Sequence, residues 1–243
     1  MKAVADLHTH STYSDGRGTI AENVRAAKAL GLEKYAITDH GPCNIGTGVR
    51  GEQKYGEIRA SVDMLREKYS GVELLVGSEA DIISLEGEID LSDKVIDELD
   101  LLIVGLHPFV WPKTWKDGVD FVWSNQVFRM TRSQEDKVRT SNTKALVDAI
   151  SRYPVDIVSH PNLGMPVDIR EIGQACADHG TAYEINVGHR FQTVEEIREV
   201  AKTGTKFVVN SDAHFPASVG QLEFGVNLLE QAGIQPEQTL NLR

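Results

Sequence analysis

The sequence predicts an α/β fold, a barrel of seven βα units, and this prediction rests on three observations. Short apolar segments alternate along the chain with amphipathic segments of helical period. Some apolar segments, such as Leu101–Val104 and Phe207–Val209, are continuous runs, which is typical of parallel strands buried on both faces. Seven such units favour a barrel over an open sheet, and 243 residues fit one domain, residues 1–243, at the small end of the barrel size range.

The elements follow one another in a regular order. We expect strands at Val4–His8, Lys34–Thr38, Glu73–Glu79, Leu99–His107, Val155–His160, Ala182–Asn186 and Lys206–Ser211. We expect helices at Ile20–Leu30, Tyr55–Tyr69, Thr143–Arg152, Asp168–His179, Val194–Lys202 and Val219–Gln231. A glycine follows closely behind five of these helices, where a left-handed residue commonly ends a helix: Gly31, Gly71, Gly180, Gly204 and Gly233.

One segment, Pro108–Arg132, interrupts this order. It contains all three tryptophans and is too long for an ordinary strand-to-helix connection. Two interpretations are open. Its aromatic side chains pack on the barrel or in a subunit interface, or the segment is a lid over a substrate site.

Composition and charge exclude several classes of protein. The formal net charge of −11 makes nucleic-acid binding unfavourable, because the chain would repel a phosphate backbone. No stretch resembles a transmembrane span or the apolar part of a signal peptide. Two cysteines, Cys43 and Cys176, do not indicate a disulfide framework. We therefore expect a cytoplasmic protein, whose oligomeric state the sequence leaves open.

The candidate functional residues gather at the ends of the expected strands. Six of the eight histidines do so: His8, His10, His40, His107, His160 and His214. Carboxylates share these positions: Asp6, Asp15, Asp39, Glu79, Asp81, Glu184 and Asp212. All strand C-termini of a parallel barrel open on one face, so these side chains should converge. Such a cluster is costly unless a cation organises it, and imidazole with carboxylate suits zinc, manganese or iron.

The local motifs make this interpretation more specific. His8 and His10 are separated by one residue and can bind one ion, because residues i and i+2 at a strand end point the same way. The complete set of motifs is His8–Gly16, Ile37–His40, Gly77–Glu79, Gly105–His107, Ser159–Pro161 and Ser211–His214. With these motifs the chain resembles the PHP (polymerase and histidinol phosphatase) family from about Ala3 onward, and it is most similar to the family's stand-alone phosphatases.

The resemblance implies a distorted (βα)7 TIM-like barrel with three divalent metal ions, zinc, manganese or iron, at the C-terminal ends of the strands. One ion would take His8, His10, Glu79 and Asp212. A second would take Glu79, His107 and His160, and a third would take Asp15, His40 and His214. The chain departs from some relatives, in which a histidine stands where Asp15 stands here, and a site richer in oxygen favours manganese or iron over zinc.

Further residues receive roles around this centre. Arg190 resembles an arginine that lies near the substrate phosphate in the family, although it can equally be a surface residue. His189 and Arg17 are further candidates for substrate binding. Asp6 and Asp39 either accept imidazole N–H groups or cap the turns that follow them.

We interpret the chain as a metal-dependent phosphoesterase that hydrolyses a small phosphate monoester by a metal-bound hydroxide. The catalytic residues would be Glu79, Asp212, His214 and Arg190. The alternatives are a metal-dependent nuclease like the PHP domains of bacterial DNA polymerases, an amidohydrolase-type hydrolase, and a metal-binding module without catalysis.

Overall fold

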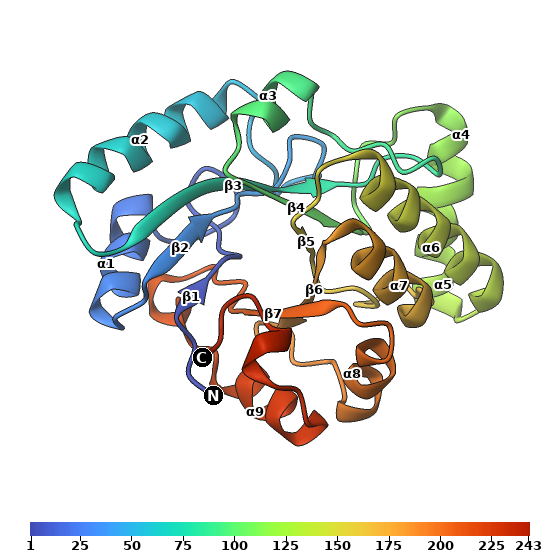
Figure 1. The fold of residues 1–243 in the computed structure, drawn as a ribbon. Coiled ribbons are helices and arrows are strands. Elements are labelled where there is room, and N and C mark those ends of the chain that lie inside the picture. Colours follow the sequence, from blue (N-terminus) through green and yellow to red (C-terminus); the bar gives the residue numbers. More distant parts are fainter.

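A computed structural model describes residues 1–243 and contains a single sheet of seven parallel strands in the order β1 to β7. The strands are β1 (Ala5–Asp6), β2 (Lys34–Ile37), β3 (Glu73–Asp81), β4 (Leu101–Gly105), β5 (Ile157–Val158), β6 (Ala182–Asn186) and β7 (Lys206–Asn210). Figure 1 looks along the axis of the ring that they form, with the helices outside it. The predicted barrel of seven βα units is confirmed.

The helices alternate with the strands. They are α1 (Ile20–Ala29), α2 (Lys54–Lys68), α3 (Asp93–Glu98), α4 (Trp115–Asp117), α5 (Ser124–Thr131), α6 (Glu135–Arg152), α7 (Ile169–His179), α8 (Val194–Ala201) and α9 (Glu223–Ala232). A π-helical turn, η1 (Gly118–Trp123), and two 3₁₀ turns, η2 (Pro216–Ser218) and η3 (Pro236–Gln238), complete the set. None of the helices combines the length and the apolar character that a membrane crossing requires.

The seam between β7 and β1 is closed by single contacts and by the C-terminal segment. Thr9 and Ala213 form one parallel bridge across the seam. In the C-terminal segment, the buried side chain of Asn241 accepts a hydrogen bond of 3.1 Å from the N–H of Val209. It donates hydrogen bonds of 2.6 and 2.8 Å to the carbonyls of Val209 and Ala5. Asn241 thus satisfies backbone groups that a direct strand pairing would otherwise satisfy.

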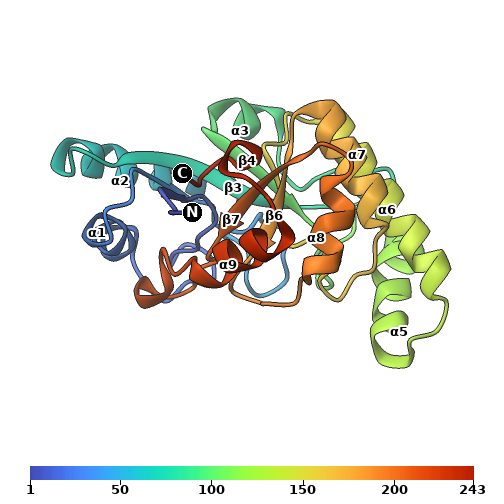
Figure 2. The same ribbon diagram turned by 60° about the horizontal axis from the view of Figure 1, so that its bottom comes forward.

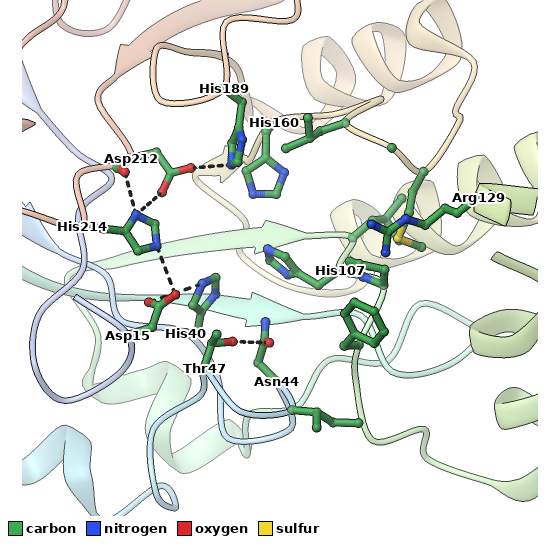
Figure 3. A pocket seen from close by; sticks show the side chains of 17 residues that line it. Asp15, His40, Asn44, Thr47, His107, Arg129, His160, His189, Asp212 and His214 are labelled. Atoms are coloured by element: carbon green, nitrogen blue, oxygen red, sulfur yellow. Dashed lines mark hydrogen bonds and ion pairs between the residues drawn. The ribbon is translucent and has the colours of Figure 1, made fainter. Parts of the chain in front are cut away.

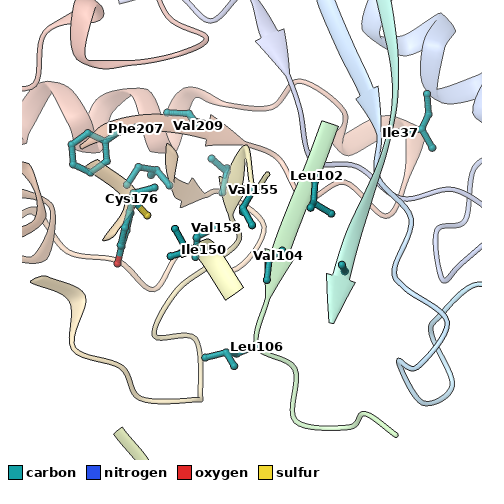
Figure 4. Packing of buried hydrophobic residues seen from close by; sticks show 14 of the residues in the cluster. Ile37, Leu102, Val104, Leu106, Ile150, Val155, Val158, Cys176, Phe207 and Val209 are labelled. Atoms are coloured by element: carbon teal, nitrogen blue, oxygen red, sulfur yellow. The ribbon is translucent and has the colours of Figure 1, made fainter. Parts of the chain in front are cut away.

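Two apolar cores follow from the period of two in each strand. Leu101 and Ile103 of β4 point into the barrel, where eight buried residues form a small cluster. Leu102 and Val104 point outward into a cluster of 48 buried residues under the helices (Figure 4). Burial on both sides explains the continuous apolar run of this strand.

Several element boundaries differ from the prediction. The short helix α3 was not expected, and α6 begins at Glu135, not at Thr143. Residues 219–222 are not helical, because Val219 has an extended backbone and Gly220 a positive φ of 69°. At Gly180 and Gly233 the expected left-handed helix ends are present, with φ values of 75° and 86°.

The segment Pro108–Arg132 forms α4, η1 and α5, which extend beyond the barrel beside α6 (Figure 2). Two of its aromatic side chains, Phe121 and Phe128, are buried. All three tryptophans are exposed, up to 87% for Trp115. The buried side chains of Phe121 and Phe128 therefore attach the segment to the body of the protein, while the three tryptophans are exposed to solvent.

Candidate metal centre

The register of the sheet places two glutamates inside the barrel at its C-terminal end. Glu79 of β3 pairs with Ile103, and Glu184 of β6 pairs with Val208, and both apolar partners belong to the inner cluster. Side chains paired in neighbouring strands point to the same face. A Cβ on Gly105 would lie 3.2 Å from Glu79 Oε1 and 2.4 Å from the Ser159 hydroxyl, so a glycine leaves space for the carboxylate.

The buried carboxylate of Glu79 is the centre of the cluster. Five imidazoles from four different strand ends lie within 3.6 Å of its two oxygens. Oε1 lies 2.8 Å from His160 Nε2 and 3.4 Å from His107 Nε2. Oε2 lies 2.9 Å from His40 Nδ1, 3.2 Å from His8 Nε2 and 3.6 Å from His10 Nε2.

The remaining predicted ligands lie close to these imidazoles. Asp212 Oδ1 lies 3.1 Å from His10 Nε2 and 3.8 Å from His8 Nε2. Asp15 lies 3.2 Å from His214 Nε2 and 3.9 Å from His40 Nε2 (Figure 3). All nine predicted ligands therefore converge on one site. His10 also belongs to the group of Asp15, His40 and His214, because one ligand atom from each lies within 4.8 Å of the others.

Three imidazoles are oriented by a hydrogen bond at Nδ1, which leaves Nε2 facing the cluster. His8 Nδ1 lies 2.7 Å from Glu184 Oε1, and His107 Nδ1 lies 2.5 Å from Asp81 Oδ1. His214 Nδ1 donates to the backbone carbonyl of Asp212 at 2.9 Å. Metal-binding histidines are held in this way, because the second nitrogen sets the tautomer and the ring orientation.

Asp81 and Glu184 were expected only as strand-end carboxylates, without a partner. The signal was present, since Asp81 follows Glu79 by two residues in the same strand and so faces the same way. Asp6 and Asp39 cap turns and do not touch an imidazole nitrogen. Asp6 accepts from the backbone and hydroxyl of Ser211, and Asp39 accepts from the backbone and hydroxyl of Ser11.

The charges of these groups depend on one another. Burial alone would lower the pKa of His8 and of His107, but the charge of Glu79 and the carboxylates behind each ring raise both well above the ordinary value. Burial would raise the pKa of Glu79, yet the surrounding imidazoles hold it well below its usual range. At the outer group, burial opposes both shifts, but the hydrogen bond between His214 and Asp15 together with the neighbouring charges outweighs it, which places the His214 pKa at about 9 and the Asp15 pKa at about 2.

A divalent cation fits this donor set. Three buried atoms of the cluster have no hydrogen-bond partner: His10 Nδ1, His40 Nδ1 and Glu79 Oε2. The last two are only 2.9 Å apart without hydrogen-bond geometry, and together with His107 they form a further group whose ligand atoms lie within 4.8 Å of one another. His160 and Asp212 have positive φ values of 28° and 50°, and such strained backbone concentrates at functional sites.

The cluster forms one end of a pocket of about 460 Å³. His189 lines this pocket, with Nε2 3.4 Å from Asp212 Oδ2. The other two residues predicted to bind substrate, Arg190 and Arg17, are not among the lining residues. The guanidinium of Arg190 lies over the ring of Phe224, 5.4 Å from its centroid. Phosphate binding by Arg190 or Arg17 stays a prediction.

Comparison with known proteins identifies the family. The sequence profile of the PHP domain matches residues 6–210. The chain belongs to the PHP domain family. Two relatives carry the name "Probable phosphatase". One, from Thermoanaerobacter sp. (strain X514), is 35% identical over 99% of this chain and 91% of its own length. The other, from Shewanella frigidimarina, is 29% identical over 99% and 90%.

The crystal structure of histidinol phosphate phosphatase from Lactococcus lactis, in complex with zinc, L-histidinol and phosphate, has the same fold. It superposes with a TM-score of 0.64 at 15% identity and covers 99% of this chain and 97% of that one. The predicted PHP membership is confirmed by the match of the family profile. Asp212 and His214 lie just beyond the residues that the family profile matches.

Proposed function

We propose that this PHP-domain protein is a metal-dependent phosphoesterase that hydrolyses a small phosphate monoester. The observation that carries the proposal is the buried Glu79 carboxylate with five imidazoles around it, at the end of a pocket sized for a small molecule. The names of the relatives and the phosphate ester in the name of the Lactococcus lactis enzyme support the same reaction class.

We assign divalent metal ions to three groups of residues. The inner groups are His8, His10, Glu79 and Asp212, and Glu79, His107 and His160; the outer group is Asp15, His40 and His214. The number of ions and their identity, zinc, manganese or iron, are part of the proposal. When bound, such ions supply an activated water and stabilise negative charge on the phosphoryl oxygens.

The chain's own residues bind and orient the substrate around this centre. His189 is half-exposed at the pocket wall, with Nε2 3.4 Å from Asp212 Oδ2, so its ring can contact a phosphoryl or leaving-group oxygen of a bound ester. Asp81 and Glu184 keep His107 and His8 in a fixed orientation. Apolar side chains such as Leu106 and Met165 line the pocket and exclude water from the organic part of the ester.

The proposal is tested with protein purified without chelator. Its metal content is measured by mass spectrometry, and hydrolysis of 4-nitrophenyl phosphate is compared with that of bis(4-nitrophenyl) phosphate and 4-nitroacetanilide. We expect the monoester to be the best substrate and a chelator to abolish its hydrolysis. Preference for the diester would favour the nuclease alternative, and preference for the anilide would favour an amidohydrolase. Protein that contains metal but hydrolyses none of the three compounds would favour the alternative of a metal-binding module without catalysis.

Cytoplasmic location and a lid function of Pro108–Arg132 also stay predictions. The lid would have its base at the centre, because the segment begins directly after His107. Its anchoring through Phe121 and Phe128 restricts any movement to the residues before these side chains.

A further inference from the structure

One permanently charged cationic side chain lines the pocket next to the metal centre. Arg129 of α5 is the only lysine or arginine among the 17 residues that line it. The other polar lining residues are carboxylates, imidazoles, an amide and a hydroxyl. Because the chain carries a net charge of −11, an arginine at this position changes what the pocket can accept.

Arg129 is positioned but not neutralised. Its guanidinium lies over the ring of Phe109, 5.5 Å from the centroid, and forms no ion pair or hydrogen bond with another side chain. An arginine stacked on an aromatic face keeps its N–H groups at the edge of the plane, where they can bind a carboxylate or phosphate in a bidentate manner. Many other arginines of this chain, such as Arg66 and Arg139, are paired with acids.

The helix that carries Arg129 is fastened to the body on two sides. The side chain of Gln126 donates to the carbonyl of Pro108, at the base of the pocket wall. Asn125 and Asn142 exchange two amide hydrogen bonds of 2.8 and 2.9 Å, and Asn142 also donates to Pro166. These buried contacts hold α5, so the base of Arg129 is preorganised and its long side chain alone remains free to adjust.

Apolar side chains also line this pocket. Ile45, Leu106, Phe109, Leu163 and Met165 all line the pocket. Figure 3 shows Arg129 across the pocket from Asp15 and His214, on the far side of His107. A ligand that fills the pocket therefore meets the metal-ligand cluster at one end, apolar side chains along its length and a guanidinium at the other end.

We propose that Arg129 is a specificity-determining residue and that the substrates are phosphate monoesters whose apolar organic part carries a second anionic group, a carboxylate or a second phosphate. The inference rests on the proposed function for the reacting phosphate, which binds at the cluster. Arg129 then binds the second anion. Monoesters with an uncharged organic part leave this guanidinium without a partner.

The experiment uses a pair of esters that differ only in the second anion, phenyl phosphate and 4-carboxyphenyl phosphate. Their kcat/KM values are measured with the metal-loaded protein and with Arg129→Gln. We expect the wild type to prefer the carboxylated ester and the variant to lose roughly 10–100-fold of that preference, with unchanged activity on phenyl phosphate. Arg129→Lys should restore part of it, because an ammonium keeps the charge but not the bidentate geometry.

The matched control is Arg132→Gln. Arg132 lies directly after α5 and its guanidinium also stacks on a phenylalanine, Phe128, but it does not line the pocket. This variant loses the same charge and should keep the wild-type preference. An equal loss of kcat/KM on both esters in Arg129→Gln would assign the arginine to the reacting phosphate, and unchanged kcat/KM on both esters would assign it to the surface. Either result overturns the inference.

A binding measurement separates this inference from the proposed function. Benzylphosphonate and 4-carboxybenzylphosphonate cannot be hydrolysed, and their dissociation constants are measured by calorimetry with metal-loaded protein. Tighter binding of the carboxylated compound that depends on Arg129 supports the inference even if no ester is hydrolysed, and in that case only the proposed reaction fails. Equal binding of both compounds refutes the inference whatever the hydrolytic activity.

Discussion

Replacing Glu79 by glutamine tests the centre most directly, because this one carboxylate contacts the imidazoles of all three residue groups. Oε1 faces His107 and His160, and Oε2 faces His8, His10 and His40, all within 3.6 Å. Glutamine keeps the size but removes the negative charge, and its amide nitrogen cannot serve as a ligand. The two inner groups therefore each lose an anionic ligand in one substitution.

The expected loss can be worked out from this geometry. Substituting a residue that only supports a ligand weakens metal binding by about 10–100-fold, so loss of the shared ligand itself should cost at least about 100-fold at each inner group. At a free metal concentration about ten times the wild-type Kd, occupancy of each group falls from about 90% to about 10%. Both inner groups are then filled at the same time in about 1% of molecules. Phosphatase activity should therefore fall to about 1% of the wild-type activity.

The assay combines metal analysis after equilibrium dialysis with turnover of 4-nitrophenyl phosphate. Asp81→Asn is the matched comparison, since Asp81 orients His107 alone and should weaken only one inner group. Circular dichroism checks that both variants keep the barrel. A Glu79→Gln protein with full metal content and near-normal turnover would refute the bridging role and the assignment of ligands around it.

Three further predictions follow from single contacts. Without a bound cation, His214 contributes stability that is fully present below its unfolded pKa of about 6.5 and is lost as the pH rises through its folded pKa of about 9. The free energy of unfolding in urea should therefore decline between these two pH values, and His214→Gln should flatten the decline. Asn241→Ala leaves backbone groups of the barrel seam unpaired and should cost about 2–4 kcal/mol in urea unfolding; a cost below about 1 kcal/mol would mean that water replaces the amide. If Arg190 leaves Phe224 to hold the substrate phosphate, Arg190→Ala should lower kcat/KM by roughly 10–100-fold with unchanged metal content, and unchanged kinetics would make it a surface residue.

The barrel and the convergence of the nine residues could be predicted because both depend on local patterns. Continuous apolar runs such as Leu101–Val104 indicate strands buried on both faces, and parallel strands bring their C-terminal residues to one rim. Histidines and carboxylates placed directly after such strands must therefore meet, whatever the details of packing. The ends of helices at Gly180 and Gly233 were predictable for a similar reason, since the left-handed conformation favours glycine.

The partners of the ligands could not be predicted in the same way. Asp81 orients His107 and Glu184 orients His8 because of the register between strands that are far apart in the sequence. Asp6 and Asp39, which stand next to ligands in the sequence, cap turns of other segments. Sequence adjacency alone does not tell which face a side chain takes once a strand has ended.

The sequence by itself determined the fold class, the family resemblance and the set of candidate ligands, because strand period and strand-end chemistry are written locally. Only the tertiary structure decided which arginine enters the pocket. Arg190 follows a strand of the barrel yet stacks on Phe224, whereas Arg129 comes from a segment outside the barrel order and lines the pocket. The physical reason is that the position of α5 depends on buried contacts between distant residues, such as the amide pair of Asn125 and Asn142, which no local pattern reveals.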